Sequence, residues 1–398
     1  MKVLVISHRI PFPPNKGEKL RTFHQLEHLT QVGHEISLLA PLHTVEDEEH
    51  AKGLAQTLKC KVTPLNLGNK IIRFLKALLT NRSFSEANFY TSKVEPSINK
   101  EINAFKPDAI LITASSLLHY VAKDNNAKYN LPILTDFMDV DSNKWDQYAD
   151  KASFPMRWVY RREAKLVRKL EQEAAQLSEE CYLIASAEVE LFKKDISTDG
   201  TVSVLANGID SVTFQANKQN KNDDDAIFLF TGVMDYKPNI DAVLWFIEHC
   251  WPNIVQHNPK AHFIIAGMNP NPSILKLASD NITVTGFVEN IMPYFQSADV
   301  FVAPFQIARG VQNKVLQAMS CEIPVVSTSR GIEGIIHTQG EDVLIADNPE
   351  EFNEQCLLLL QNKALKAEIG LKARQTILQN YAWPEVLKPL TNRLESLS

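Results

Sequence analysis

The chain has few glycines and cysteines for its 398 residues, and it has no long apolar run. With 14 glycines and 44% hydrophobic residues it is unlike collagen, disordered chains and disulfide scaffolds. The five cysteines are scattered and form no C-x-x-C pair, so we expect buried thiols in a reducing cytoplasm. No run approaches the ~20 apolar residues of a membrane-spanning helix, and residues 1–7 predict a buried strand instead of a signal peptide.

An excess of positive charge is also missing. The chain has 41 basic and 47 acidic side chains, which argues against a protein that coats nucleic acid, so we expect no nucleic-acid partner. The net charge of -6 is unevenly spread, because residues 1–206 carry +1 and the remainder carries -7. At about 100 to 200 residues per domain, the length predicts two domains.

Motifs of three common enzyme classes are absent. The sequence contains no G-x-G, no G-K-[ST] and no G-x-S-x-G, so dehydrogenases, P-loop NTPases and α/β hydrolases lose their usual support. His24 and His28 stand four apart on an expected helix and could share a metal, but no third ligand accompanies them. We expect one packed histidine, one solvated histidine and no metal site.

Short apolar runs alternate with stretches of helical period along the whole chain. Strands that are apolar on both faces are covered by helices on both sides, so the pattern predicts an α/β fold with parallel, doubly wound sheets. The expected strands are 3–6, 36–39, 62–65, 109–112, 133–134 and 181–184, followed by 227–230, 262–266, 282–284, 300–303, 323–326 and 343–345. We therefore expect one doubly wound parallel sheet in each half of the chain.

The boundary between the two halves is marked by a turn signal at 207–210 and a polar run at 215–225. We expect an N-terminal lobe over 1–206, a C-terminal lobe over 207–383 and a final helix over 384–398 that packs back on the first lobe. Ligands of such sheets bind at the carboxyl ends of the strands, so a cleft between the lobes is the expected active site.

Two N-terminal segments carry candidate site residues. The Pro-rich loop with Lys16 and Gly17 follows the first strand; it either receives an anion on its free N–H groups or forms an ordinary tight turn. Asp139, Asp141 and Ser142 follow another expected strand. Asp139 and Asp141 match the D-x-D pattern that holds a divalent metal on a sugar nucleotide in single-lobe glycosyltransferases, whereas Asp141 or Ser142 could instead cap the next helix.

Two C-terminal segments are also informative. Residues 301–319 predict a strand, a loop with Arg309 and Gly310, and a helix that begins near Lys314. Cations and helix N–H groups at one point suit a diphosphate, although both cations could simply be solvated. Glu333 lies in the loop after the strand 323–326, where it either faces the cleft or caps a helix.

Taken in order, these segments resemble the family-4 glycosyltransferases of the two-lobed GT-B fold over nearly the whole chain. The resemblance is carried by the Gly17 loop with Arg21 and by segments 33–36, 207–210, 230–232, 265–267, 286–288, 304–319, 331–334 and 381–383. Segments 13–17, 139–142 and 308–314 are similar to one branch, the sugar transferases encoded with bacterial exosortase-linked exopolysaccharide systems.

The resemblance implies a retaining, hexosyltransferase-type transfer from a nucleoside diphosphate sugar to a glycan acceptor, without a metal or other cofactor. Arg309, Gly310 and Lys314 would contact the diphosphate, and the backbone around Gly267 and Val288 would hold the base.

On the acceptor side, the loop of Lys16 and Gly17 would approach the donor from the N-terminal lobe. Asp139, Asp141 and Ser142 would line the acceptor site, where one of the two aspartates would orient or deprotonate the acceptor hydroxyl.

The chain departs from the family pattern at three places. Arg309 and Gln317 stand where the family has two glutamates, and the amide of Gln317 would weaken the ribose contact by about 1 to 2 kcal/mol. The usual basic pair after Gly232 is missing, which leaves only Lys237. A nucleotide-sugar-binding homologue with little turnover therefore stays open, as does a nucleotide-sugar epimerase of the same fold.

Two segments are rich in basic and aromatic residues. Residues 70–82 contain four cations and no acid, and residues 151–172 contain seven cations against two acids. Such segments lie on anionic bilayers or form solvated basic faces. We expect a cytoplasmic protein that associates peripherally with the inner face of the bacterial inner membrane and uses a lipid-linked glycan acceptor.

Overall fold

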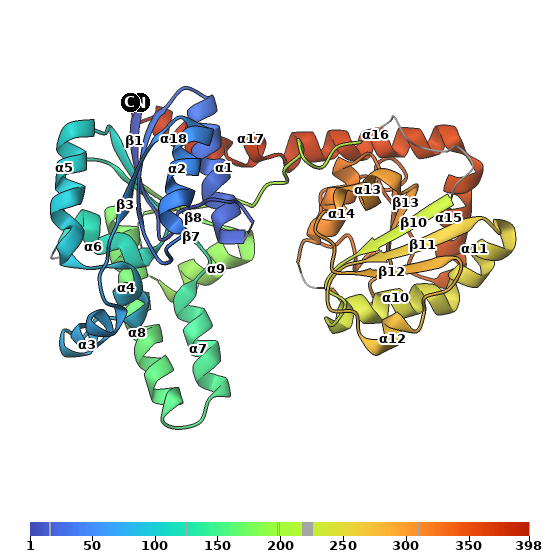
Figure 1. The fold of residues 1–398 in the computed structure, drawn as a ribbon, viewed down its shortest axis with the longest axis horizontal. Coiled ribbons are helices and arrows are strands. Elements are labelled where there is room, and N and C mark those ends of the chain that lie inside the picture. The colour runs from blue at the N-terminus through green and yellow to red at the C-terminus, as the bar shows by residue number, and fades with distance from the viewer. Residues whose placement is uncertain are drawn as a thin grey trace. The chain divides into compact units, whose positions relative to one another are not determined.

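The chain folds into two compact units (Figure 1). We describe residues 1–15, 17–123, 126–196, 198, 200–216, 226–308 and 310–397 of a computed structural model. The N-terminal unit comprises Met1–Asn207 together with Val386–Ser398, and the C-terminal unit comprises Gly208–Glu385. The break at Asn207 lies within the turn signal at 207–210, where the side-chain ring of Trp383 packs so closely on Gly208 that a Cβ would lie 2.6 Å from it.

The N-terminal unit is built on a parallel sheet with the order β3-β2-β1-β4-β7-β8-β9. Its strands are β1 (Lys2–Ile6), β2 (Glu35–Pro41), β3 (Lys61–Leu65), β4 (Ala109–Ile112), β7 (Ile133–Met138), β8 (Glu180–Leu183) and β9 (Thr201–Val204). Each apolar run expected in this half forms a strand. The edge strand β9 and a small hairpin, β5 (Ala122–Lys123) with β6 (Asn126–Ala127), were not predicted.

The C-terminal unit has a second parallel sheet with the order β12-β11-β10-β13-β14-β15. Its strands are β10 (Ala226–Thr231), β11 (Ala261–Ala266), β12 (Ile282–Gly286), β13 (Val300–Ala303), β14 (Val325–Ser327) and β15 (Leu344–Ile345). In both sheets the strand order reverses beside the first strand, which is the doubly wound arrangement expected from the sequence. Each sheet has its own apolar core.

Helices cover both faces of each sheet; in Figure 1, for example, α13 and α14 lie across the C-terminal sheet from α10. The helices of the N-terminal unit are α1 (Gly17–Gln31), α2 (Asp47–Leu58), α3 (Lys70–Leu79), α4 (Phe84–Phe89), α5 (Glu95–Phe105), α6 (Leu118–Val121), α7 (Asp141–Lys151), α8 (Met156–Leu177) and α9 (Ser186–Asp195). Those of the C-terminal unit are α10 (Lys237–His249), α11 (Trp251–His257), α12 (Pro272–Leu275), α13 (Met292–Ser297), α14 (Asn313–Ser320), α15 (Pro349–Gln361) and α16 (Lys363–Asn380).

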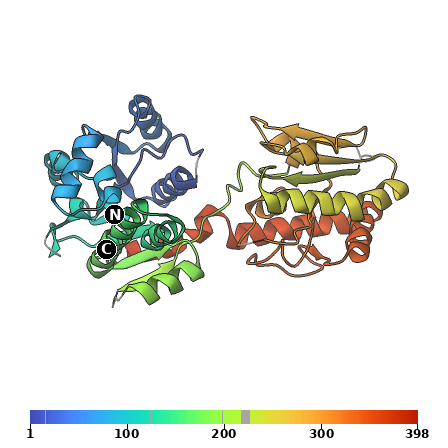
Figure 2. The ribbon, with the colours of Figure 1, turned by 90° about the horizontal axis from the view of Figure 1, so that it is seen from below.

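The end of the chain forms two short helices, α17 (Trp383–Val386) and α18 (Lys388–Glu395), where a single helix was expected. Helix α18 packs on the N-terminal unit, so the two chain ends lie side by side (Figure 2). His28 Nε2 lies 3.0 Å from Thr391 Oγ1, and Arg393 donates a 2.9 Å bond to Glu179. His24 is buried as well, beside Glu27 at 2.9 Å, so the expectation of one solvated histidine was wrong.

A buried ion pair joins α1 to β7. Arg21 is fully buried and donates two bonds to Asp136, from Nε at 2.7 Å and from Nη2 at 2.8 Å. Its third nitrogen donates to the carbonyl of Ala206 and to the Asn207 side chain, and Gln25 donates a 2.6 Å bond to the same carboxylate. One guanidinium therefore holds a helix, a central strand and the end of the unit together.

We expect Asp136→Asn to lower the free energy of unfolding of the N-terminal unit by about 3 kcal/mol, because it leaves the Arg21 cation buried without its carboxylate. Urea titration followed by circular dichroism measures the change. The control Asp150→Asn removes an exposed carboxylate that pairs with Arg161, and it should cost less than about 1 kcal/mol. Equal effects of the two substitutions would contradict the assigned role of the buried pair.

Candidate functional site

Two glycines lie at the carboxyl edge of the C-terminal sheet and allow two strand ends to approach closely. Gly232 follows β10 and Gly267 follows β11, and the Gly232 N–H donates a 3.0 Å bond to the carbonyl of Ala266. Gly267 has φ +151°, and a Cβ there would lie 1.7 Å from the Gly232 carbonyl oxygen. No larger residue fits at Gly267, so the two strand ends can approach only with glycine.

Lys314 lies at this edge, in the first turn of α14. Its Nζ donates a 2.6 Å bond to Asn239 Oδ1 and lies 5.0 and 4.9 Å from the ring centroids of Phe230 and Phe305. A Cβ at Gly232 would lie 2.9 Å from the same nitrogen. Burial lowers the pKa of Lys314 to about 8. The ammonium has lost much of its water without gaining a carboxylate among the described residues, and such a group favours an incoming anion.

Four other candidate residues for donor binding lie in the C-terminal unit. Gly310 has φ +67°, which favours glycine, while Arg309 lies outside the described residues. Gln317 follows Lys314 by three residues on α14, so the two side chains share one helix face. Val288 lies two residues after β12 and is partly buried.

Two further candidates are on the surface. The Lys237 ammonium is 82% exposed and pairs with Asp241 at 2.9 Å. The Glu333 carboxylate is exposed and lies 4.0 Å from Arg330. Both side chains are held by neighbours on the same turn of chain, and neither is part of the group around Lys314.

The N-terminal unit has a pocket of about 900 Å³ at the carboxyl ends of its strands. Gly17, Asp139 and Asp141 line it, together with His8 after β1 and Asn207 at the end of the unit. The loop that follows β1 and the aspartates that follow β7 are thus brought to one pocket. Lys16 lies outside the described residues.

The two aspartates are presented by an irregular end of β7. The strand pairing shifts register between Asp136 and Met138, and Met138 has φ +66°, which turns the chain out of the sheet. Lys144 donates to both carboxylates, at 2.8 Å to Asp139 and 3.2 Å to Asp141. Burial raises the pKa of Asp141 even though half of its side chain is open to solvent, and Lys144 opposes this shift.

The first turn of α7 is capped by other helices. The N-cap residue is Val140, whose N–H donates to Glu188 at 2.9 Å, and the Ser142 N–H donates to Glu171 at 3.0 Å. The alternative in which Asp141 or Ser142 caps this helix was therefore wrong. Ser142 is fully buried, and burial raises the pKa of Glu171 to about 7. Neighbouring helices thus satisfy the N–H groups of Val140 and Ser142, and Asp139 and Asp141 line the pocket.

His8 is a pocket residue that the sequence analysis missed. Its Nδ1 lies 3.0 Å from Thr113 Oγ1, and its ring packs edge-on against Phe89 at 5.6 Å. The available signal was its position directly after the first strand, where parallel sheets place ligand-binding side chains.

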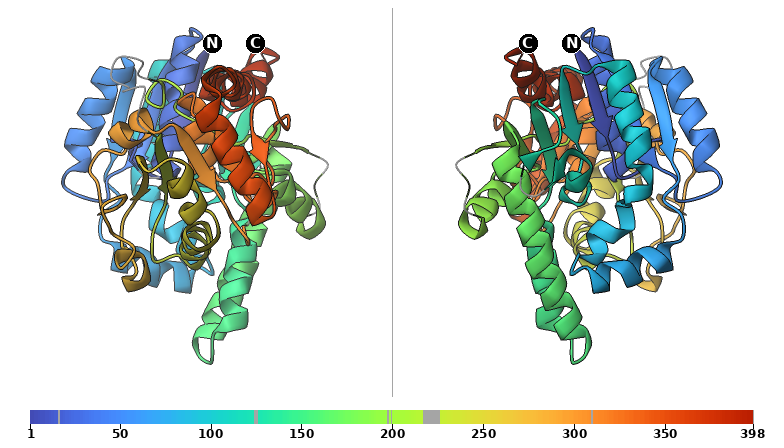
Figure 3. Two further views of the ribbon diagram at one scale, coloured as in Figure 1. Left: turned by 90° about the vertical axis from the view of Figure 1, so that its right-hand side faces the viewer. Right: turned by 90° about the vertical axis from the view of Figure 1, so that its left-hand side faces the viewer.

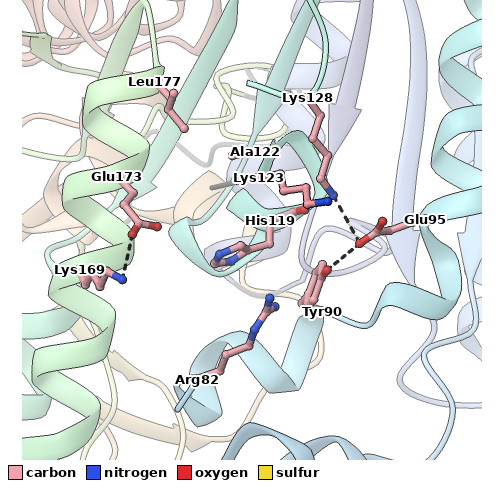
Figure 4. A pocket seen from close by; sticks show the side chains of 10 residues that line it. All are labelled: Arg82, Tyr90, Glu95, His119, Ala122, Lys123, Lys128, Lys169, Glu173 and Leu177. Atoms are coloured by element: carbon pink, nitrogen blue, oxygen red, sulfur yellow. Dashed lines mark hydrogen bonds and ion pairs between the residues drawn. The ribbon is translucent and has the colours of Figure 1, made fainter. Parts of the chain in front are cut away.

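A second pocket of the N-terminal unit has a volume of about 650 Å³ (Figure 4). Glu95 accepts a 2.6 Å bond from the Tyr90 hydroxyl and lies 3.4 Å from the Lys128 ammonium. Lys169 pairs with Glu173 at 3.4 Å. Two ion pairs thus form within this pocket, and none of the candidate residues lines it.

The described parts of the chain contain no group of three His, Cys, Asp or Glu side chains that could hold a metal ion. No helix in these described parts is long and apolar enough to cross a bilayer.

Comparisons with known proteins show a similarity to a glycosyltransferase family in the C-terminal unit and a common fold over the whole chain. Residues 225–362 match the family described as glycosyl transferases group 1. Over 395 residues the chain is 22% identical to an uncharacterized 44.6 kDa protein in the cps region of Klebsiella pneumoniae, and the match covers 96% of each chain. The structure of Anabaena HepE in complex with UDP aligns over the full length of both chains with a TM-score of 0.59 at 13% identity.

A partial match is the GDP-mannose-dependent monoacylated alpha-(1-6)-phosphatidylinositol monomannoside mannosyltransferase of Corynebacterium glutamicum. It is 25% identical over 158 residues, which is 36% of this chain and 42% of that protein. The C-terminal unit thus contains a segment similar to the glycosyl transferases group 1 family, and the expected GT-B fold is confirmed. The narrower expectations, family 4 and a retaining mechanism, stay predictions.

Lys314→Met should weaken the binding of inorganic pyrophosphate at pH 7 roughly tenfold or more, because a charge-assisted bond is lost. In the wild type, affinity should fall roughly tenfold between pH 7 and 9, since the ammonium loses its proton around pH 8. The variant should show little of this decline. Calorimetric titration measures both effects, and Lys260→Met, at an exposed lysine before β11, should match the wild type. A pH dependence that persists in Lys314→Met would contradict the assignment.

Proposed function

We propose that this protein is a family-4, metal-independent, retaining glycosyltransferase. It moves a hexosyl group from a nucleoside diphosphate sugar to a lipid-linked glycan in the synthesis of an exopolysaccharide. The observation that carries the proposal is the desolvated Lys314 ammonium at the glycine-lined edge of the C-terminal sheet, within the segment that matches the glycosyltransferase domain.

The C-terminal unit would bind the donor. When the bond from the anomeric carbon to the diphosphate breaks, negative charge develops on the departing phosphate oxygen. The Lys314 ammonium, the N–H groups that begin α14 and the chain at Gly310 are the groups that would stabilise it. A cation with little water around it interacts more strongly with this charge than a solvated one. HepE, a protein of the same fold, was solved in complex with UDP, which supports a nucleotide as part of the donor.

The N-terminal unit would bind the acceptor. Asp141 and Asp139 lie in its pocket next to His8, where a carboxylate could orient an acceptor hydroxyl or receive its proton. The raised pKa of Asp141 makes it a better proton acceptor than an ordinary aspartate, and Lys144 keeps both carboxylates in place.

Two relatives support the choice of acceptor and pathway. One is a cps-region protein that aligns with almost the whole chain, and the other is named for a phosphatidylinositol monomannoside, which is a glycolipid. We therefore propose a lipid-linked acceptor and a place in the synthesis of a surface polysaccharide.

A nucleotide-sugar-binding protein with little turnover is the second candidate. Gln317 favours it, because an amide on the Lys314 face of α14 replaces a carboxylate that would accept bonds from both ribose hydroxyls. Restoring the charge in Gln317→Glu would then strengthen nucleotide binding.

The activity can be tested by measuring the release of nucleoside diphosphate from a panel of nucleotide sugars, with and without a bacterial membrane lipid extract. We expect release that depends on the extract and a roughly 100-fold lower kcat for Asp141→Asn, because proton transfer is impaired. The exposed control Asp150→Asn should keep the wild-type rate. If no donor releases nucleoside diphosphate but UDP still binds, the protein is a nucleotide-sugar-binding protein and the proposal of an enzyme is rejected.

Helix α3 provides a surface for the membrane. Ile71 and Leu75 are 71% and 57% exposed, and Ile72, Leu78 and Leu79 extend the same apolar surface. The Arg73 guanidinium fixes the helix by donating to the backbone carbonyls of residues 67, 68, 87 and 88. An exposed apolar stripe beside Lys70 and Lys76 is typical of helices that lie in an anionic bilayer surface.

In a flotation assay with anionic phosphatidylglycerol vesicles, we expect the wild-type protein to float. Leu75→Glu should lower its partition coefficient roughly tenfold, because one buried leucine contributes about 1.5 to 3 kcal/mol. The control is Leu371→Glu, at an exposed leucine of α16 in the C-terminal unit, which should not change flotation. Wild-type protein that stays at the bottom of the gradient would reject membrane association.

A further inference from the structure

The pocket that holds Asp139 and Asp141 continues along the helical hairpin of α7 and α8. This hairpin extends away from the sheet of the N-terminal unit (Figure 3). On α8 the pocket is lined at spacings of one, three or four residues by Met156, Val159, Tyr160, Glu163, Val167 and Leu170. Such spacings place the side chains on one helix face, and 14 residues of helix span roughly 20 Å. The pocket is therefore a groove that leads from the strand ends toward the tip of the hairpin.

The α7 side and the opposite wall of the groove are largely aromatic. Trp145 and Tyr148 line it from α7, and their rings are 5.7 Å apart. Phe74 of α3 and Phe84 of α4 line it from the other side at a ring distance of 5.3 Å. Hydrocarbon and aromatic surface thus faces the groove from four helices.

The buried carboxylate in the groove is already engaged. Glu163 is 1% exposed and accepts bonds from the N–H groups of Phe84 and Ser85, at 2.7 and 3.1 Å. It holds the start of α4 and offers little to a ligand. The rest of this wall is mainly hydrocarbon and aromatic, and a hydrocarbon chain can be buried there without losing hydrogen bonds to water.

The outer end of the groove is lined by one cation and one apolar residue. Lys70, the first residue of α3, and Met156, the first residue of α8, both line it. Beside them lie the exposed apolar stripe of α3 and the exposed rings of Phe154 and Trp158, which are 85% and 63% accessible. The groove is thus continuous with the surface for which membrane contact is proposed above.

We propose that this groove binds the hydrocarbon chain of the lipid-linked acceptor, with the acceptor sugar at Asp139 and Asp141 and the chain lying along α8, between α7 on one side and α3 and α4 on the other. The proposal rests on the proposed function and adds the part of the substrate that this unit recognises. The inner end is polar, the length of the hairpin is apolar, and the outer end carries cations that suit an anionic membrane surface.

The test uses the full chain and two soluble probes, farnesyl phosphate and dodecyl phosphate, below their critical micelle concentrations, with inorganic phosphate as the head-group control. We expect calorimetry to show binding of at least one lipid and at least tenfold weaker binding of inorganic phosphate. Tighter binding of farnesyl phosphate would indicate an isoprenoid acceptor lipid, and tighter binding of dodecyl phosphate would indicate an acyl lipid. Absence of lipid binding, or equal binding of inorganic phosphate, would overturn the proposal.

Two substitutions at one position locate the binding. Val159→Glu places a charge in the middle of the groove and Val159→Trp fills it, and each should weaken lipid binding at least tenfold. The control Gln176→Glu adds the same charge at an exposed position of α8 and should bind like the wild type. Circular dichroism checks that each variant is folded. If the folded Val159 variants bind the lipids as tightly as the wild type does, the hydrocarbon chain of the lipid binds outside this groove.

These results separate the groove from the activity. If lipid binding fails but nucleotide sugars are still turned over with a water-soluble glycan, the groove proposal is wrong and the glycosyltransferase stands. If the lipids bind and the Val159 variants lose them while no donor is turned over, the groove stands and the proposed function fails.

Discussion

The N-terminal site depends on the buried pair of Arg21 and Asp136. Arg21 lies one turn into α1, whose first residue is Gly17, and Asp136 lies three residues before Asp139. The pair therefore fixes the loop after β1 against the carboxylates after β7. Since Arg21 also binds Ala206 and Asn207, the same guanidinium sets the point at which the chain leaves this unit. A buried charge pair adds little net stability over apolar packing, but its geometry permits one arrangement of these three segments.

The C-terminal site is made by a different means. No ion pair holds Lys314 among the described residues; close backbone contact at Gly232 and Gly267 leaves room for its ammonium, and two aromatic rings take the place of water. The cost of this desolvation is visible in the lowered pKa. In the N-terminal site the buried Arg21 cation is paired with a carboxylate, whereas in the C-terminal site the Lys314 cation bonds, within the described parts of the chain, only to an amide, at the edge where ligands bind in this kind of sheet.

The sequence predicted the sheets well, because strands buried on both faces must be apolar throughout. It missed β9, an edge strand whose Thr201 and Ser203 interrupt the apolar pattern. The position of Asp139 and Asp141 directly after a strand was also predicted, because the strand that precedes them is apolar. The groove was not, because its lining comes from four helices far apart in the chain, and only packing brings Phe74, Trp145 and Val167 to one surface. Arg309 and Lys16 lie outside the described residues.

The anchoring of α3 by Arg73 has a consequence for the free energy of the proposed membrane binding. A peptide that becomes helical only on the bilayer must order its backbone as it binds, at a cost of about 1 to 2 kcal/mol per residue. Here Asn69 caps the first turn and Arg73 holds four carbonyls, so the apolar stripe is already ordered. On the bilayer surface proposed above, the ordered helix would lose little conformational entropy, so each buried apolar side chain would add more to the binding free energy than in a peptide that folds as it binds.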